Sequence, residues 1–314
     1  MKALRLEAGA LRLAEVEVPR PREGQALVRV RVAGICNTDL ELVKGYMGFE
    51  GTLGHELVGE VVEGSERWRG RRVCVDINYA CGVCDVCQAG GGHHCPTRTV
   101  LGILGQDGAF ATHLVAPEAN LFAVPDGVDD DAAVFTEPLA AAFEILEQLT
   151  LEKTTRVLVL GDGKLGLLCA MALATTGCAL TLVGHHPNKL ARARGIATAT
   201  EIPELGYDVV VEATGSRAGL ADALRVVRPR GTVVLKSTFA GTPEVDTNRI
   251  VVDEIRLLGS RCGPFDRALE ALAAGAVDPR TLVDARYGLE DGVQAMTHAA
   301  TRGTLKVLLD LPRD

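Results

Sequence analysis

The chain has 314 residues, of which 47% are hydrophobic and 24% charged, with a formal net charge of −8. Because nearly half of the residues can be buried, the composition excludes a disordered chain, and the length favours two domains. The excess of acidic over basic residues argues against a nucleic-acid partner.

The N-terminal residues 1–18 mix charged residues with apolar ones. They contain no apolar run long enough for a signal peptide or a membrane span, so we expect a cytoplasmic enzyme with no membrane partner. In a reducing compartment the nine cysteines are expected to be thiols or metal ligands rather than disulfides.

Residues 1 to about 124 predict a β-rich barrel or sandwich. Apolar and polar residues alternate with a period of two in 11–18, 26–35, 55–64, 71–77 and 108–116. The stretch 124–135 then combines a turn with acidic residues that open a helix, which predicts a crossover into a second domain.

From Thr154 the pattern changes to apolar strands that alternate with helices. The strands are expected at 156–161, 179–184, 208–215 and 232–237, and the helices at 164–177, 187–195 and 220–231. This alternation predicts a doubly wound parallel sheet covered on both faces. Helices at 266–275 and 292–303 precede an apolar strand at 304–311, which the pattern alone assigns to neither domain.

A glycine-rich loop follows the first of these strands. Gly161, Gly163 and Gly166 form a G-x-G-x-x-G pattern, and Lys164 and Leu165 open the next helix. Such glycines allow a tight turn and a close approach of the backbone to a pyrophosphate at the helix N-terminus. We predict a dinucleotide-binding loop; the alternative is a plain turn between a strand and a helix.

The next strand ends without the carboxylate that usually holds the adenosine ribose. Gly184 is followed there by His185, His186 and, after two more residues, Lys189. The missing acid removes repulsion toward a 2′-phosphate and the basic residues supply donors, so we expect NADP to be preferred, with NAD possible. The alternative is an exposed polar loop that binds NAD through its backbone.

Four cysteines lie within one short segment. Cys81, Cys84, Cys87 and Cys95 offer four soft ligands, which suits a closed tetrahedral zinc site that stabilises a loop-rich lobe. A closed site leaves no position for substrate, so its role should be structural. In an alternative set, His93 or His94 replaces Cys95 as a ligand.

A third group of residues comes from three separate segments. Cys36 precedes Thr38 and Asp39, His55 precedes Glu56, and Glu137 lies much later. A thiolate, an imidazole and carboxylates are ligands of a catalytic zinc that keeps one position open. Taken singly, Cys36 could be a buried thiol, His55 a turn histidine and Glu137 a helix N-terminal charge.

Together these motifs resemble the zinc-dependent medium-chain dehydrogenase/reductase family, the group of alcohol, sorbitol and glucose dehydrogenases. The resemblance rests on GICNTDLE, GHELVGEVVEG, CGVCDVCQAGGGHHC, TEPLA, VLGDGKLG, VEATG and GTLKVLLD, in family order along essentially the whole chain. It implies a GroES-like catalytic domain of residues 1–124 and 267–314, interrupted by a Rossmann domain of residues 125–266. It also implies two zinc ions per chain, one catalytic and one structural, and a homodimer or homotetramer.

The resemblance implies roles at the catalytic zinc. Cys36 and His55 are expected as ligands, and Glu137 takes the place of the third ligand. Glu56 either coordinates zinc directly or lies just behind it, and Asp39 orients His55.

Further roles concern the proton relay and the cofactor. Thr38 corresponds to the hydroxyl that accepts the alcohol proton. Glu41 either relays protons, binds a substrate hydroxyl or is an exposed helix residue. Thr214 and Lys236 are expected at the cofactor, although a lysine at a strand end is often just solvated.

The resulting hypothesis is a zinc-dependent enzyme that transfers hydride between NAD(P) and a polyol, sugar or secondary alcohol. One alternative is a zinc-free, NADPH-dependent quinone or enone reductase, and another is a nucleotide-binding relative without catalysis. Both alternatives fit poorly with a chain that keeps the cysteine lobe, the expected zinc ligands and Thr38.

Overall fold

The computed structural model describes residues 1–238, 242 and 244–312, and the chain forms two compact units. Unit 1 comprises Met1–Glu137 and Ala268–Asp314, and unit 2 comprises Pro138–Arg267. Residues 125–137 belong to unit 1, and side chains of strand residues in that unit form hydrogen bonds with them. Arg72 donates to Asp130 at 2.9 Å, and the Cys74 thiol donates to the carbonyl of Ala133 at 3.2 Å.

Unit 1 is built from three sheets. Its strands are β1 (Lys2–Glu7), β2 (Ala10–Glu15), β3 (Gln25–Gly34), β4 (Gly51–Thr52), β5 (Glu56–Glu63), β6 (Arg72–Val75), β7 (Asn78–Tyr79), β8 (Thr99–Leu101), β9 (Gly105–Gln106), β10 (His113–Pro117), β11 (Leu121–Ala123), β18 (Val283–Gly288) and β19 (Lys306–Asp310). The largest sheet has the order β11-β6-β5-β3-β19-β18, with β10 paired to β3. The smaller sheets have the orders β2-β1-β4 and β7-β8-β9.

Helices of unit 1 are short and connect these strands. They are α1 (Asn37–Val43), α2 (Asp85–Gln88), α3 (Asp130–Ala133) and α10 (Gly292–Ala299). Two longer helices, α4 (Thr136–Gln148) and α9 (Phe265–Ala273), each contain a unit boundary.

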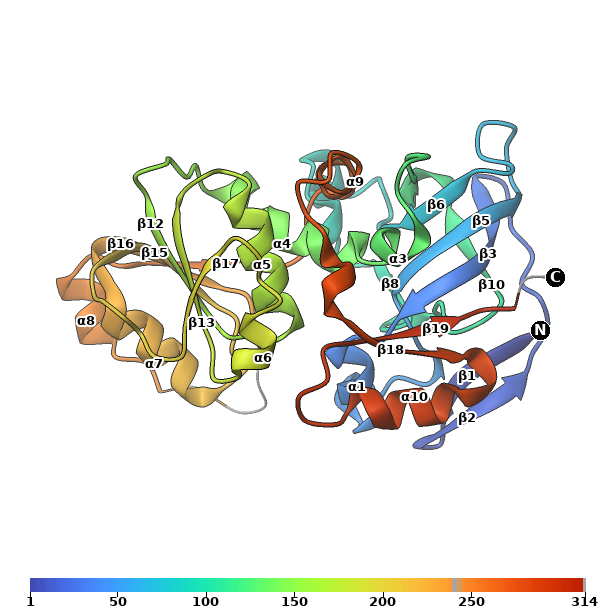
Figure 1. The fold of residues 1–314 in the computed structure, drawn as a ribbon. Coiled ribbons are helices and arrows are strands. Elements are labelled where there is room, and N and C mark those ends of the chain that lie inside the picture. The colour runs from blue at the N-terminus through green and yellow to red at the C-terminus, as the bar shows by residue number, and fades with distance from the viewer. Residues whose placement is uncertain (239–241, 243, 313–314) are drawn as a thin grey trace. The chain divides into compact units, whose positions relative to one another are not determined.

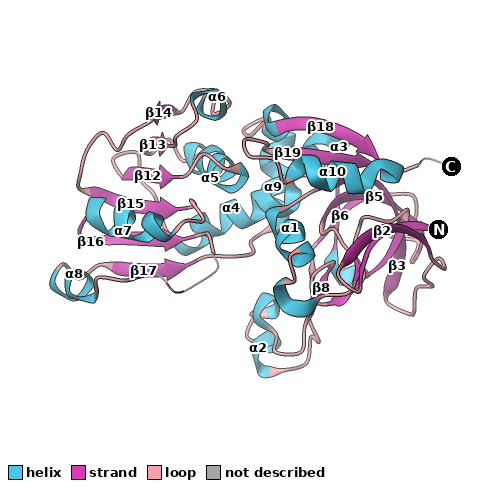
Figure 2. Ribbon diagram, turned by 90° about the horizontal axis from the view of Figure 1, so that it is seen from below, coloured by secondary structure: helices cyan, strands magenta, loops and turns pink. Residues whose placement is uncertain are grey.

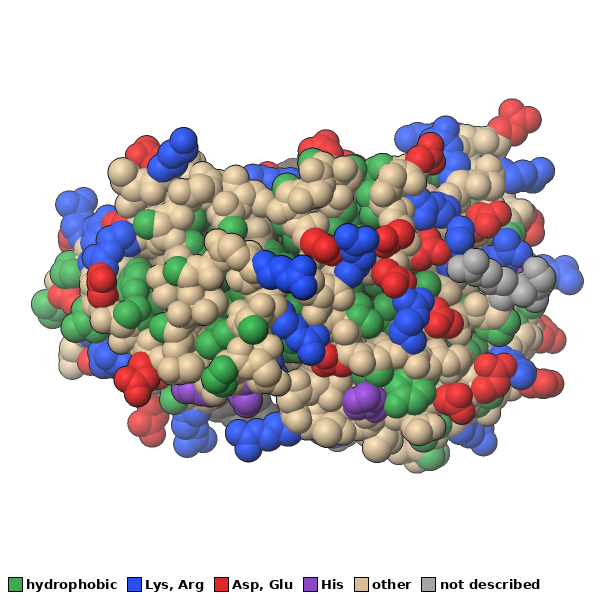
Figure 3. Space-filling model, viewed as in Figure 1, with side chains coloured by type: hydrophobic (Ala, Val, Ile, Leu, Met, Phe, Trp, Pro, Cys, Tyr) green, Lys and Arg blue, Asp and Glu red, His purple; other side chains and the backbone are tan. Residues whose placement is uncertain are grey.

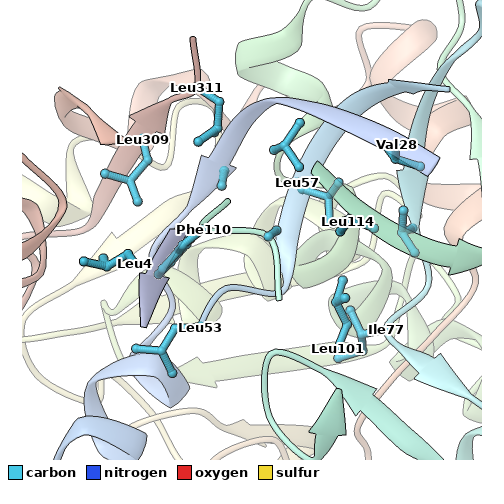
Figure 4. Packing of buried hydrophobic residues seen from close by; sticks show 14 of the residues in the cluster. Leu4, Val28, Leu53, Leu57, Ile77, Leu101, Phe110, Leu114, Leu309 and Leu311 are labelled. Atoms are coloured by element: carbon cyan, nitrogen blue, oxygen red, sulfur yellow. The ribbon is translucent and has the colours of Figure 1, made fainter. Parts of the chain in front are cut away.

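The C-terminal strand returns to the N-terminal part of the chain. β19 pairs antiparallel with β3, so that Leu308 lies opposite Gly34, and Figure 1 shows the red strand beside the blue one. Leu309 and Leu311 join Leu4, Leu57 and other residues from the first half of unit 1 in one hydrophobic core (Figure 4). Burial of this shared core stabilises a unit made from two distant stretches of sequence.

The described residues of unit 2 form a parallel sheet of six strands with connecting helices, confirming the predicted doubly wound domain. Its strands are β12 (Arg156–Leu160), β13 (Ala179–Val183), β14 (Ala197–Ala199), β15 (Tyr207–Glu212), β16 (Val227–Leu235) and β17 (Arg256–Gly259). Figure 2 shows them side by side in the order β14-β13-β12-β15-β16-β17. The connecting helices include α5 (Lys164–Ala174), α6 (Pro187–Leu190), α7 (Arg217–Val226) and α8 (Thr247–Val252).

The clearest differences between the predicted elements and the structure concern two helices and the first strand. The helix expected at 220–231 ends at Val226, because Pro229 lacks an N–H and Arg230 has a φ of 60°. The helix expected at 187–195 is limited to α6. The first strand expected, at 11–18, is preceded by β1, with which β2 forms a hairpin.

The surface carries charges of both signs. On the face drawn in Figure 3, acidic and basic side chains are interspersed. Within the described residues, no helix is long and apolar enough to cross a membrane.

Candidate active site and metal centres

A buried aspartate ties together the two loops that carry Cys36 and His55. Cys36 caps α1, and its backbone N–H donates to Asp39 Oδ2 at 2.8 Å. Asp39 Oδ1 accepts from the backbone N–H of Gly54 at 3.2 Å and lies 3.3 Å from His55 Nδ1. This last contact falls short of hydrogen-bond geometry, so among the described residues His55 Nδ1 has an electrostatic neighbour but no hydrogen-bond acceptor.

The potential around His55 is negative. Burial lowers the pKa of His55, but the nearby charges of Asp39 and Cys36 raise it by more, and the net pKa lies well above its ordinary value. Surroundings that favour a proton on a buried imidazole also favour a metal cation in its place. The electrostatics of this cluster therefore fit a divalent metal.

Glu56 completes a group of three donors. One ligand atom from each of Cys36, His55 and Glu56 lies within 4.8 Å of the other two. Sulfur, nitrogen and oxygen donors of this kind are zinc ligands, and three protein ligands leave a fourth position open. The Glu56 carboxylate is also paired with Lys306, whose Nζ donates further to the carbonyl of Ile35 at 3.4 Å.

Glu137 lies near this group without joining it. It is the second residue of α4, and restricted access to water raises its pKa to about 7, although the charge of His55 opposes this shift. Its carboxylate is not one of the three ligand atoms grouped within 4.8 Å.

The two residues expected in the proton relay are placed differently. Thr38 is half-buried, and its Oγ1 lies 3.7 Å from Cys36 Sγ. Glu41 is exposed on α1 and pairs with Lys44 at 2.8 Å. The structure therefore brings Thr38 to the metal-ligand group, and it places Glu41 where an ordinary exposed helix residue would lie.

The four clustered cysteines converge on one point. Cys84 Sγ lies 3.5 Å from Cys87 Sγ and 3.9 Å from Cys95 Sγ, and Cys81 Sγ lies 3.9 Å from Cys87 Sγ. A tetrahedral zinc ion with Zn–S bonds of about 2.3 Å separates its sulfur ligands by about 3.8 Å. A disulfide would require about 2 Å. The sulfur positions thus fit one zinc ion.

Cys95 Sγ is grouped with the other three sulfur atoms, all within 4.8 Å of one another. Hydrogen bonds from the backbone of Cys81 and from Thr97 lower the pKa of Cys95 to about 6, which favours the thiolate that binds metal. His93 Nε2 instead contacts Asp76 Oδ2 at 2.7 Å.

Each glycine of the loop after β12 has a different structural reason. Gly161 has a φ of 116°, and a Cβ there would lie 2.5 Å from the carbonyl oxygen of Ala213. At Gly166 a Cβ would overlap the carbonyl of Gly161, whereas at Gly163 it would meet nothing within 4 Å. The first and third glycines are therefore required for packing, and the second leaves open space at the N-terminus of α5. Lys164 and Leu165, the first residues of α5, are half-buried beside it.

The turn after β13 contains the predicted basic residues. His185 is exposed, His186 is half-buried, and Lys189 is 9% exposed. Gly184 is buried and lies against Asp162, a residue of the glycine loop. The turn after β13 and the loop after β12 are thus in contact.

Thr214 and Lys236 have partners within unit 2. The backbone N–H and hydroxyl of Thr214 both donate to Glu212 Oε1, at 2.8 and 2.5 Å. Lys236 Nζ donates to the carbonyls of Ala141 and Arg261, at 2.5 and 3.1 Å, and to Ser260 Oγ at 3.3 Å. These contacts tie Lys236 to the segments of unit 2 that carry Ala141 and Ser260–Arg261, and its expected role at the cofactor stays a prediction.

Sequence reasoning missed Lys306, Asp162 and Glu212. Signals were available for two of them, since Lys306 interrupts an otherwise apolar strand and Asp162 places a carboxylate inside the glycine motif. Glu212 is 4% exposed at the end of β15 and accepts from Ser237 as well as from Thr214.

Comparison with known families gives two matches. Residues 22–126 match the family model of the alcohol dehydrogenase GroES-like domain, and residues 165–275 match that of the zinc-binding dehydrogenase domain. The first match lies in unit 1 and includes the cysteine cluster, and the second begins at the end of the glycine loop, covers most of unit 2 and ends in unit 1.

Individual relatives extend over nearly the whole chain. A sorbitol dehydrogenase of Halalkalibacterium halodurans is 32% identical and is covered over 99% of its length, with 98% of this chain aligned. An L-galactonate-5-dehydrogenase of Escherichia coli K12 is 28% identical over 86% of each chain. These proteins are similar to this chain along both units.

Solved structures show the same fold. A protein of Sinorhizobium meliloti 1021 that was assigned as a zinc-binding dehydrogenase and solved with NADP has a TM-score of 0.90 and 29% identity, over 98% of both chains. An alcohol dehydrogenase of Escherichia coli CFT073 complexed with NADH has a TM-score of 0.91 and 26% identity, over 99% of both chains.

Proposed function

The chain belongs to the zinc-dependent medium-chain dehydrogenase/reductase family, and we propose which of its residues support hydride transfer between a nicotinamide cofactor and a polyol, sugar or secondary alcohol. The observation that carries the proposal is the convergence of donor atoms from Cys36, His55 and Glu56 within 4.8 Å. Zinc bound there would supply Lewis acidity that lowers the pKa of the substrate hydroxyl.

The remaining steps belong to the side chains around that site. Asp39 fixes the Cys36 backbone and faces the His55 ring, which preorganises two of the donors. The Thr38 hydroxyl, beside Cys36, relays the proton that the substrate alcohol loses: its oxygen takes that proton while its own hydrogen passes on toward solvent. Residues of the glycine loop hold the cofactor pyrophosphate through backbone N–H groups at the start of α5.

The third zinc ligand is proposed to be Glu56. Its carboxylate is grouped with Cys36 and His55, which supports it over Glu137. Zinc content and activity of Glu56→Gln and Glu137→Gln test this choice. Loss of one zinc per chain only in Glu56→Gln supports it, and loss only in Glu137→Gln reverses it.

A second, structural zinc is proposed at the cysteine lobe, and NADP is proposed as the preferred cofactor. The four Sγ positions support the first proposal. The absence of an acidic side chain at the end of β13 and the presence of His185, His186 and Lys189 support the second. A higher kcat/KM with NAD than with NADP would refute the cofactor preference.

The substrate class is proposed from the relatives, which include dehydrogenases of sorbitol and L-galactonate. A cofactor-reduction screen over polyols, sugars, sugar acids and secondary alcohols tests it. Turnover of a polyol or sugar above that of simple secondary alcohols supports the assignment. Turnover of quinones or enones alone would assign the chain to another reaction class.

We propose a homodimer or homotetramer joined along β17. This strand is last in the sheet order, and Leu257 on it is 38% exposed, near the exposed Val251 and Val252 of α8. Light scattering should give at least twice the chain mass of 33.2 kDa, and Leu257→Glu should reduce it. A monomeric wild-type protein would contradict the proposal.

A cytoplasmic setting is proposed from the cysteines. All nine lie among the described residues and are free of disulfides, as expected in a reducing compartment. Loss of zinc and thiols on exposure to mild oxidant, with loss of activity, is the expected behaviour.

A further inference from the structure

Asp162 occupies space that a side chain at the end of β13 would otherwise take. A Cβ on Gly184 would overlap the Asp162 side chain and lie 2.5 Å from its Cγ and Oδ2. Asp162 is itself 8% exposed. The glycine loop thus places a carboxylate at the end of β13, although β13 itself ends without one.

This carboxylate is bonded to His186 twice. Asp162 Oδ2 accepts from the backbone N–H of His186 at 2.7 Å, and Nδ1 of the ring lies 3.0 Å from Oδ2 and 3.2 Å from Oδ1. An ionised carboxylate only accepts hydrogen bonds, so Nδ1 must carry the hydrogen. The contact therefore fixes both the turn and the ring, and it leaves Nε2 for another partner.

The ring is accessible to such a partner. The His186 side chain is 34% exposed, in contrast to the Asp162 side chain at 10%. In dinucleotide-binding folds, the residue at the end of this strand distinguishes a ribose 2′-hydroxyl from a 2′-phosphate. Here the carboxylate is covered by His186, so the group available to the ribose is an imidazole rather than an acid.

We propose that Asp162 positions His186 to recognise the 2′-phosphate of NADP, an inference that rests on the proposed cofactor site. When a phosphate lies against Nε2, protonation of that nitrogen gives an imidazolium held between two anions, Asp162 and the phosphate. With NAD the 2′-hydroxyl offers no such charge. Asp162 is thus a positioning residue, and His186 is the residue that discriminates between the cofactors.

The test is a titration of NADPH and NADH binding by fluorescence, which needs no turnover, together with competition by 2′-AMP and 5′-AMP. We expect Asp162→Asn and His186→Ala each to weaken the binding of NADPH and 2′-AMP by about tenfold or more, which corresponds to the loss of one charge-assisted contact. The affinity for NADH and 5′-AMP should change by less than about threefold. The double variant should equal His186→Ala, because Asp162 acts through the ring.

A matched control is Asp222→Asn, which removes a surface carboxylate of unit 2 that pairs with Arg225 at 3.0 Å. This variant should bind both nucleotides with wild-type affinity. Equal weakening of NADPH and NADH in Asp162→Asn would show a merely structural role and overturn the inference, as would tighter NADPH binding. If the ratio of NADPH affinity to NADH affinity changes as expected while no alcohol is oxidised, the inference stands and the proposed function fails. If alcohol is oxidised and this ratio is unchanged in the variants, the proposed function stands and the inference fails.

Discussion

Lys306 and Glu56, which are 250 residues apart in the sequence, form an ion pair in which each side chain is 1% exposed. Gly34 on β3 lies opposite Glu56 of β5 on one side and opposite Leu308 of β19, two residues after Lys306, on the other. A side chain on Gly34 would overlap Glu56 Oε2. The glycine therefore leaves room for a lysine on one strand to neutralise a carboxylate two strands away.

Replacing Lys306 should be costly in the zinc-free protein, because it leaves the Glu56 carboxylate buried with no cation beside it. Lys306→Met is expected to lower the free energy of unfolding by about 3–5 kcal/mol, the usual effect of removing one partner of a buried pair. Urea unfolding of both proteins after removal of zinc measures this. Lys2→Met is the control, because Lys2 pairs with Glu290 with both side chains about half exposed, and it should cost about 0–1 kcal/mol. Equal losses in the two variants would show that the Lys306–Glu56 pair adds no stability.

Sequence reasoning found the parts of the site whose residues are close together in the sequence. It missed contacts between residues that are far apart in the sequence. The cysteine lobe lies within Cys81–Cys95, and its metal-ligand spacing can be counted directly. The Lys306–Glu56 pair depends on the register of three strands, which no local pattern specifies.

The acidic run Asp129–Asp131 also shows that sequence patterns predict local structure but not long-range contacts. The run Asp129–Asp131 predicted a helix start, and Asp129 does cap α3 by accepting from Ala132 N–H at 2.8 Å. Each of the three aspartates also pairs with an arginine of unit 1. Asp129 pairs with Arg280, Asp130 with Arg72 and Asp131 with Arg286. These long-range pairs hold the segment in unit 1, and the sequence carries no sign of them.

The cysteine lobe should depend on its metal for stability. Cys84→Ser removes one of four ligands, so we expect zinc content to fall by about one ion per chain and Tm to fall by about 5 °C or more, the shift produced by about 2 kcal/mol. Turnover per folded molecule should change little. Cys178→Ser is the control, because this half-buried thiol donates to the carbonyl of Leu173 at 3.6 Å and belongs to neither of the metal-ligand groups found among the described residues. An unchanged zinc content in Cys84→Ser would contradict a metal site here.

Alanine substitutions at two glycines of the same loop should have different effects, one on stability and the other on cofactor binding. Gly166→Ala introduces a Cβ that overlaps the carbonyl of Gly161, so it should lower stability by about 1–3 kcal/mol. Gly163→Ala meets nothing within 4 Å, so its stability should change by less than about 1 kcal/mol, while cofactor binding weakens by about tenfold or more. Thermal unfolding and nucleotide titration separate the two effects. Normal cofactor affinity in Gly163→Ala would place the pyrophosphate elsewhere.

The most direct test of the central claim is the alcohol-dependent reduction of cofactor by His55→Ala, measured with zinc content and cofactor affinity on the same sample. We predict a loss of turnover of about 10³-fold or more, one zinc fewer per chain, and a cofactor Kd within about threefold of wild type. His298→Ala, which removes a histidine of unit 1 that contacts the Tyr287 hydroxyl at 2.9 Å, should retain both zinc and turnover. Wild-type turnover in His55→Ala would contradict a mechanism that depends on metal held by Cys36, His55 and Glu56.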